Sequence, residues 1–103
     1  MPCYITVRIF QEEFEDINAM RKAAQAMGLR MEERGSEIWI AGEIKVTRQG
    51  KKYVMQTSNG NVLRSLMDEY AAAKVEREAK RRNLQVKKVK ARDGEITLTI
   101  TER

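Results

Sequence analysis

The residues with the clearest capacity for chemistry are the cations in the second half of the chain. Segment 74–92 holds nine basic residues and only two acidic ones. Lysine and arginine side chains spread over a helix end and an adjoining strand can neutralise several phosphates at once. The segment therefore predicts a surface for polyanions or nucleic acid, made of Lys74, Arg77, Lys80, Arg81, Arg82, Lys87, Lys88, Lys90 and Arg92.

The same cations have a structural interpretation that the sequence leaves open. Basic residues at the C-terminus of a helix complement the helix dipole, and lysines on an edge strand oppose aggregation. Under this interpretation segment 74–92 is ordinary solvated surface. We prefer the interpretation as solvated surface and keep nucleic-acid binding as the alternative function.

A second candidate is the polar face of the predicted sheet. If both predicted helices cover one face, the other presents Tyr4, Thr6, Arg8, Trp39, Lys45 and Thr97. Aromatic rings flanked by cations anchor homodimer contacts, and in some proteins they stack on single-stranded bases. We expect a protein interface first, then plain solvent exposure, then nucleic acid. The residues of that predicted interface are Tyr4, Arg8 and Trp39.

Catalytic chemistry has little basis in these residues. The chain has no histidine and a single cysteine, Cys3, so a thiol nucleophile would have no imidazole base and a zinc site would lack its usual ligands. The carboxylates at 12–16 and at 32–33 fall on predicted helix and turn surfaces without a partner base. We therefore expect a protein that is not an enzyme, with no catalytic residue, no metal site and no cofactor.

The elements that position these residues begin with a strand at 4–10, where apolar and polar residues alternate. A helix is predicted at 12–27, with carboxylates in its first turn and Gly28 as a left-handed cap. Short antiparallel strands separated by glycine-containing turns are expected next, at 29–33, 37–40, 43–47 and 52–57.

A long helix and a hairpin complete the chain. Segment 61–82 lacks glycine and proline, and its apolar residues form one stripe that needs a sheet to cover. Strands at 84–92 and 95–101 flank the turn Asp93-Gly94 and are expected to join that sheet. The apolar phase changes within 84–92, which indicates either a bulge at 87–88 or an edge strand whose outer end faces water.

These elements predict a single α+β domain over residues 1–103, with two helices on one face of an antiparallel sheet. A duplicated β-α-β-β unit is a hypothesis that the order of the elements supports. The charge is uneven: residues 1–50 hold seven basic and eight acidic residues, whereas 51–103 hold thirteen and seven. No apolar run is long enough to cross a bilayer, and no signal peptide precedes the first strand, so we expect a cytoplasmic protein without a membrane partner.

One further indication comes from a family resemblance. Residues 70–79, then Leu84 and Val86, the Asp93-Gly94 turn and the strand from Ile96 follow the pattern of a family of small cyanobacterial and plastid proteins of uncharacterised function. The chain resembles this family, the hypothetical chloroplast reading frame thirty-five type, over about two-thirds of its length. The resemblance implies an accessory component, sometimes associated with an ATPase of the AAA type. Family members usually carry a Trp- and Tyr-rich segment before the second helix, which this chain lacks.

The sequence therefore favours a small accessory or interaction module with a protein partner, either a second copy or a larger assembly. The alternative is a nucleic-acid-binding protein that uses segment 74–92. Salt dependence of binding separates the two, because binding to phosphates weakens steeply as salt is added.

Overall fold

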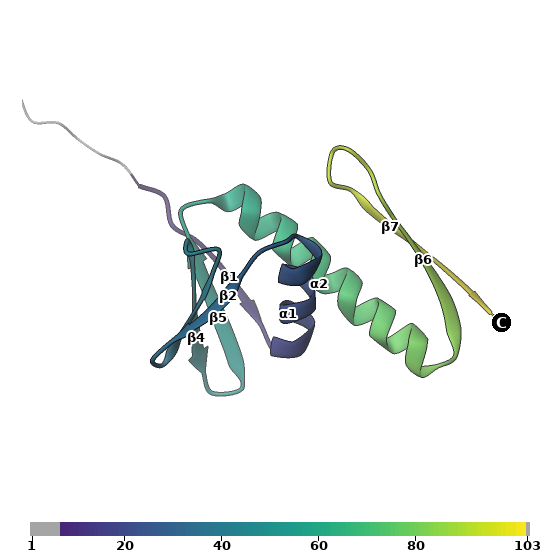
Figure 1. Cartoon of the computed structure of the whole chain (residues 1–103), viewed down its shortest axis with the longest axis horizontal. Coiled ribbons are helices and arrows are strands. Elements are labelled where there is room, and N and C mark those ends of the chain that lie inside the picture. The colour runs from purple at the N-terminus through teal and green to yellow at the C-terminus, as the bar shows by residue number, and fades with distance from the viewer. Residues whose placement is uncertain (1–6, 103) are drawn as a thin grey trace, which may run out of the picture.

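The computed structural model of the chain describes residues 7–102 and shows two antiparallel sheets joined by a long helix (Figure 1). The larger sheet has the strand order β1-β5-β4-β3-β2. Its strands are β1 (Phe10–Phe14), β2 (Met31–Arg34), β3 (Glu37–Ile40), β4 (Ile44–Gln49) and β5 (Lys52–Thr57). The helices are α1 (Ile17–Ala26) and α2 (Gly60–Arg81), and the smaller sheet is the hairpin of β6 (Leu84–Lys90) and β7 (Ile96–Glu102).

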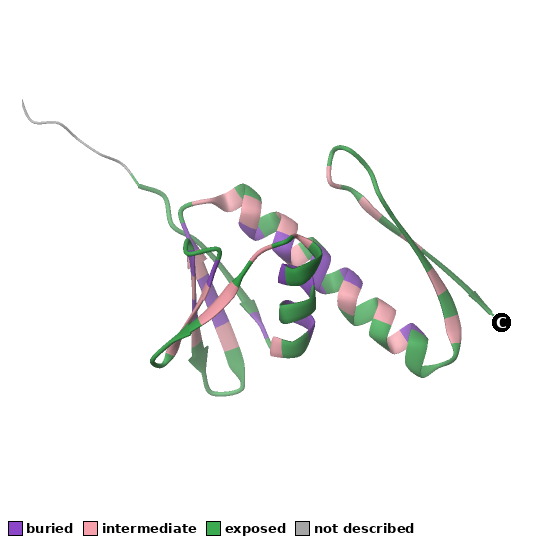
Figure 2. Cartoon of the chain, in the orientation of Figure 1, coloured by how far each residue is buried: buried purple, intermediate pink, exposed green. Residues whose placement is uncertain are grey.

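Both helices lie on the same face of the five-stranded sheet, as the sequence predicts (Figure 1). The buried residues between the layers form one cluster, made of Phe14, Ile40, Ile44, Val46 and Met55 from the strands and Ala19, Met20, Ala23, Ala24, Leu63, Leu66 and Tyr70 from the helices. Burying a side chain of the size of leucine or methionine contributes roughly 1.5–3 kcal/mol, so this cluster is the main source of stability. Figure 2 shows the buried residues concentrated there, with the hairpin mostly exposed.

The structure corrects the prediction for the start of the chain. The strand expected at 4–10 lies partly outside the described residues, and residues 7–9 belong to no strand. The first strand is β1, so Glu12 and Glu13 lie in a strand and not in the first turn of a helix. The reason is Phe14, which is buried and stacks on Tyr53 of β5 at 5.1 Å between ring centroids. Helix α1 begins only after Asp16, whose side chain caps it by accepting from the Ala19 N–H.

The remaining elements of the sheet are close to their predicted positions. Gly28, Gly35 and Gly50 follow α1, β2 and β4 with φ of +69°, +63° and +64°, a backbone conformation that glycine adopts readily. Strands β2 to β5 form a meander of neighbouring antiparallel pairs. Strand β1 pairs with β5, so α1 carries the chain from one edge of the sheet to the other.

The hairpin differs from the prediction because it does not join the larger sheet. The α+β class is confirmed, and the order strand, helix, strand, strand does occur twice, but the second pair of strands forms a sheet of its own. Pairing in the hairpin runs without a bulge from Leu84↔Glu102 to Lys90↔Ile96. The edge-strand alternative is therefore the correct one, and Val89 points away from the helix with 52% of its surface exposed.

The separate hairpin makes the molecule long. The described chain measures 66 × 33 × 20 Å, and its radius of gyration of 16.1 Å exceeds the value of about 13 Å for a compact domain of this size. The hairpin lies along α2 at the end of the long axis away from the five-stranded sheet (Figure 1). It is thus attached to the rest of the molecule mainly through one helix.

Candidate interaction surface

Helix α2 supports the hairpin with the side that faces away from the larger sheet. Leu66 and Tyr70 enter the main core, whereas Ala72 and Ala79 are buried on the opposite side of the helix. Seven residues separate these two alanines, which is two helical turns, so both lie under the hairpin strands. The small side chains let the strands approach α2 closely. This second apolar side is absent from the sequence prediction, because alanines in a helix are equally typical of plain helix formation.

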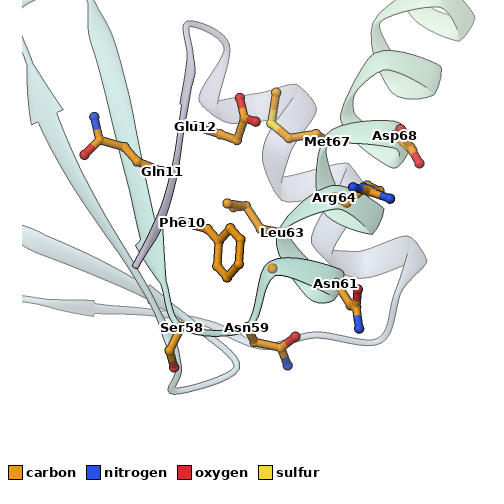
Figure 3. Close-up of a pocket in the computed structure, with 11 residues that line it drawn as sticks. Phe10, Gln11, Glu12, Ser58, Asn59, Asn61, Leu63, Arg64, Met67 and Asp68 are labelled. Carbon is orange, nitrogen blue, oxygen red and sulfur yellow. The ribbon is translucent and has the colours of Figure 1, made fainter. Parts of the chain in front are cut away.

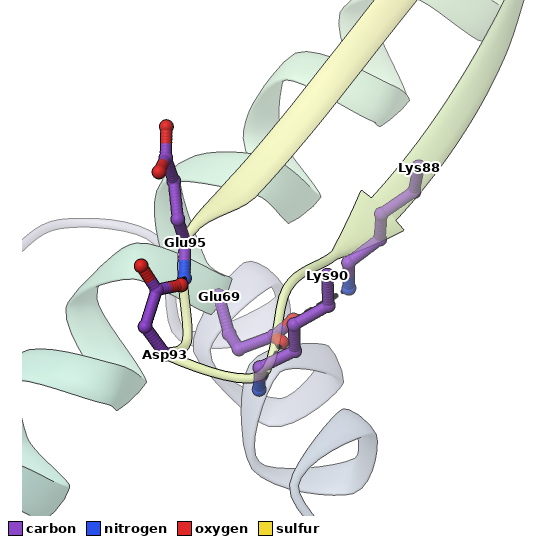
Figure 4. A network of polar contacts seen from close by, with 5 residues as sticks. All are labelled: Glu69, Lys88, Lys90, Asp93 and Glu95. Carbon is purple, nitrogen blue, oxygen red and sulfur yellow. Dashed lines mark hydrogen bonds and ion pairs between the residues drawn. The ribbon is translucent and has the colours of Figure 1, made fainter.

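An ion-pair cluster joins the hairpin to α2 (Figure 4). The side chain of Glu69, only 3% exposed, accepts hydrogen bonds from Lys88 Nζ at 2.6 Å and from Lys90 Nζ at 3.0 Å. Burial raises the pKa of the Glu69 carboxyl, but hydrogen bonds and charge from the two ammonium groups outweigh it and hold that pKa below its ordinary value. Glu69 is therefore ionised at neutral pH and holds β6 on the helix.

This cluster explains the change of apolar phase in β6. Leu84, Val86, Lys88 and Lys90 all lie on the helix-facing side of the strand, since alternate residues share a face. Lysine replaces an apolar residue at the last two of these positions because Glu69 lies beneath them. Two residues predicted to bind polyanions are thus bound to a carboxylate of the same chain.

A second ion pair uses another of the predicted cations. Arg77 of α2 donates to the carboxylate of Asp16, the residue that caps α1. The Arg77 hydrogen bond and the Ala19 N–H lower the pKa of Asp16. The hydroxyl of Tyr70 accepts from the Asp16 N–H at 3.2 Å, so two residues of α2 fix the start of α1.

The structure gives the nine predicted cations different surroundings. Arg81 and Arg82 pair with Glu78, and Lys74 Nζ lies 5.3 Å from the centre of the Tyr70 ring. Among residues 7–102, three of the nine have neither an ion pair nor a cation–π contact: Lys80, Lys87 and Arg92. Lys87 lies on the hairpin face turned away from α2, opposite to Lys88, so the nine do not share one face.

The structure places part of the predicted aromatic interface. Trp39 lies in β3 beside Lys45 of β4, on the sheet face away from the helices, and the Arg34 guanidinium lies 5.5 Å from its ring centre. Arg8 is exposed and precedes β1. Tyr4 is outside the described residues, and Thr97 belongs to the hairpin and not to this face. Trp39 and Lys45 are therefore together as predicted, whereas Thr6, like Tyr4, lies outside the described residues.

The hairpin offers a surface that the sequence does not single out. Within residues 7–102 neither strand of the hairpin has a second neighbour, so each has an unpaired edge. A groove of about 350 Å³ runs between α2 and β7, lined by Asp68, Ala71, Ala72, Val75, Glu95, Ile96 and Leu98. Val75 beside it is 40% exposed and Ile100 of β7 is 45% exposed. The signal in the sequence was the alternation of Ile96, Leu98 and Ile100 with threonines, which predicted the strand but not its free edge.

A larger open hollow of about 830 Å³ lies between β1 and the first turns of α2 (Figure 3). Phe10, Leu63 and Met67 supply its apolar part, and Glu12, Arg64 and Asp68 bring charges of both signs to its rim. The charges at this rim are of mixed sign, so they do not select one class of ligand. Within residues 7–102 no group of three or more acidic, cysteine or histidine side chains is placed to hold a metal ion.

Comparison with protein families, with curated proteins and with solved structures finds no match to the chain. The resemblance to the cyanobacterial and plastid family therefore stays a prediction. None of the described helices is long and apolar enough to cross a membrane.

Proposed function

We propose that the chain is a non-enzymatic interaction module that associates with itself, or with a larger assembly, through its hairpin. One observation carries this proposal: within residues 7–102, β6 and β7 form a two-stranded sheet with both edges unpaired and with apolar side chains left half-exposed. A hairpin of two strands is marginal in water, and three or more strands or further packing are needed for independent stability. A partner strand would supply the further packing that α2 alone does not give the hairpin. A cytoplasmic location stays a prediction from the sequence.

The uneven charge is consistent with this role. Residues 1–50, which include β1 to β4 and α1, hold eight carboxylates and seven cations, whereas residues 51–103, which include α2 and the hairpin, hold seven carboxylates and thirteen cations. The excess of cations in the second half of the chain makes two hairpins repel one another in most orientations. Only orientations that keep the cations apart are then favourable. The resemblance to a family of accessory components implies the same kind of role.

The test is sedimentation of the full chain over a wide range of protein concentration, at low and at high salt. We expect the average mass to rise with concentration beyond that of the monomer. The rise should persist at about 0.5 M salt, because screening weakens contacts between exposed charges far more than apolar contacts. A mass that stays at the monomer value up to millimolar concentration, with no rise at either salt, would contradict self-association.

The alternative function, binding of nucleic acid, has one observation in its favour. Lys80, Lys87 and Arg92 are exposed and have no carboxylate partner among residues 7–102, so their charge is available to phosphates. Cations of this kind give binding that is insensitive to sequence and strongly dependent on salt.

The variant Lys80→Glu/Lys87→Glu/Arg92→Glu tests this alternative without touching the Glu69 cluster. Titration of single-stranded DNA into the wild-type chain should show a log–log salt slope of about −0.7 per phosphate neutralised, and the triple variant should lose most of the affinity. The matched control reverses three exposed cations outside the segment that likewise have no ion pair or cation–π contact among residues 7–102: Arg21, Lys22 and Lys51. Equal loss in both variants would point to bulk charge and would reject a site on the hairpin.

A further inference from the structure

We infer that the outer edge of β7 pairs antiparallel with the β7 edge of a second copy, so that two hairpins form one four-stranded sheet. This inference rests on the proposed self-association and names its surface. The strand order would be β6-β7-β7-β6, with one α2 from each copy on the same side. The occupant of the β7 edge is thus another molecule of this chain.

The position of α2 over the hairpin favours the β7 edge. All residues that line the 350 Å³ groove come from α2, from β7 and from Glu95 just before it, and none comes from β6. The helix therefore leaves β7 less covered than β6, which Glu69 holds through Lys88 and Lys90. A strand added beside β7 would extend the sheet over the open side of this groove. It would also bring new apolar surface near Val75 and Ile100, which are 40% and 45% exposed.

The charges of β6 and β7 also favour pairing through the β7 edge. Strand β6 contains three lysines within seven residues, whereas β7 contains no cation and one carboxylate, Glu102. In the β6–β6 register that uses all seven residues, Lys87 would lie directly opposite the partner's Lys87, and like charges directly opposite one another are destabilising. Pairing β7 with a second β7 meets no such repulsion. Among residues 7–102, the β7 edge is therefore the one that a second copy can pair with most favourably.

The sequence of β7 also suits pairing with itself. The register that uses all seven residues has its two-fold axis at Thr99, and it places Leu98 opposite the partner's Ile100. In this register even-numbered residues lie opposite even-numbered residues and odd-numbered opposite odd-numbered. Residues on one face of β7 therefore continue onto the same face of the partner's strand. The apolar face of each hairpin therefore continues into that of the other, and threonines face threonines on the outer side. Aliphatic pairs of this kind add favourable side-chain contacts to the hydrogen bonds of the strands.

The first experiment uses Ile100→Lys, with Val89→Lys as the matched control. Both residues are β-branched, half-exposed positions of the hairpin, but only Ile100 would meet the partner. Sedimentation should show the dimer dissociation constant raised by about tenfold or more in Ile100→Lys, and changed little in Val89→Lys. Circular dichroism establishes that both variants are folded. Equal dimer formation in the two variants would overturn the inference.

The second experiment measures the register directly by cross-linking. Cys3 is first replaced by serine, and Thr99→Cys is then compared with Thr97→Cys under oxidising conditions. A disulfide needs Cβ atoms about 3.5–4.5 Å apart, and directly opposite residues, at about 4.5–5.5 Å, reach this separation with a small shift, so Thr99→Cys should form a disulfide-linked dimer. Thr97→Cys should not, because in this register Thr97 lies opposite the partner's Thr101.

The outcomes separate the two proposals. If the chain dimerises but neither Ile100→Lys weakens the dimer nor Thr99→Cys cross-links it, the β7 edge is wrong and self-association stands. A chain that stays monomeric at every concentration contradicts both. Preferential cross-linking of Thr97→Cys would likewise reject the two-fold axis at Thr99.

Discussion

Individual residues determine which charges of this chain are paired, and Glu69 is the clearest case. In the sequence it is one carboxylate among many on a long helix, and Lys88 and Lys90 look like members of a basic patch. The structure makes these three one buried cluster (Figure 4). Charge counting could predict the excess of cations but not which of them are neutralised, because the pairing depends on how the hairpin lies over α2.

Replacing Glu69 by glutamine should therefore destabilise the protein. Breaking a buried ion pair costs up to about 3–5 kcal/mol, but the two lysines are partly exposed and can turn to water, so we expect roughly 1–3 kcal/mol. Urea unfolding measures the loss. Glu76→Gln, on the same helix and without an ion pair among residues 7–102, is the control and should change the free energy of unfolding by less than about 0.5 kcal/mol. Equal stability of the two variants would show that the cluster contributes nothing.

The lowered pKa values of Glu69 and Asp16 predict how stability depends on pH. A carboxyl group with a lower pKa in the folded state stabilises that state above its ordinary pKa of about 4, and this stabilisation is lost as the pH falls through the folded value. In that range the unfolded chain binds more protons, so the free energy of unfolding decreases on acidification. Urea midpoints should be level from about pH 7 to pH 5 and fall below about pH 4. Glu69→Gln should flatten part of this fall, and an unchanged slope would contradict the assignment to Glu69.

At the scale of elements, the periodic segments were predictable and the contacts between them were not. Strands β2 to β5, α2 and the hairpin lie close to their predicted positions, because their alternation, glycine turns and uninterrupted helical segment are local signals. The start of α1 was missed, since the carboxylates before it are typical of a first helical turn, while the pairing of Phe14 with Tyr53 is a contact between distant segments. The separate hairpin was missed for the same reason. Its attachment depends on alanines of α2 that carry no distinctive pattern.

The packing of α1 against the core gives an element-scale prediction. Ala23 has no exposed surface and belongs to the main cluster, whereas Ala26, one turn later, is exposed. Ala23→Leu adds volume to a filled core and should cost about 1–3 kcal/mol, because neighbouring side chains must move. Ala26→Leu makes the same substitution at the exposed last residue of α1 and should change stability by less than about 0.5 kcal/mol. Thermal or urea unfolding of the pair tests whether α1 is held as closely as the structure shows.

At the scale of the whole molecule, the two sheets have unequal support. The larger sheet shares a continuous core with both helices, whereas the hairpin rests on one side of α2 through two alanines and the Glu69 cluster (Figures 1 and 2). Segments with few buried apolar contacts open at a lower free energy than the core of the same protein. The hairpin should therefore open on its own, before the larger sheet unfolds.

Hydrogen exchange of backbone amides tests this difference, and it also tests the association of hairpins. At low protein concentration the amides of β6 and β7 should exchange faster than those of β4 and β5, because local opening exposes them without global unfolding. If β7 pairs with a second copy, raising the concentration should slow exchange in β7 and leave β4 unchanged, since binding stabilises only the segment that it covers. In Ile100→Lys the concentration should have no such effect. If the hairpin amides are as protected as those of β4 in the dilute protein, the hairpin is as stable as the larger sheet. The physical argument for its association with a partner would then fail.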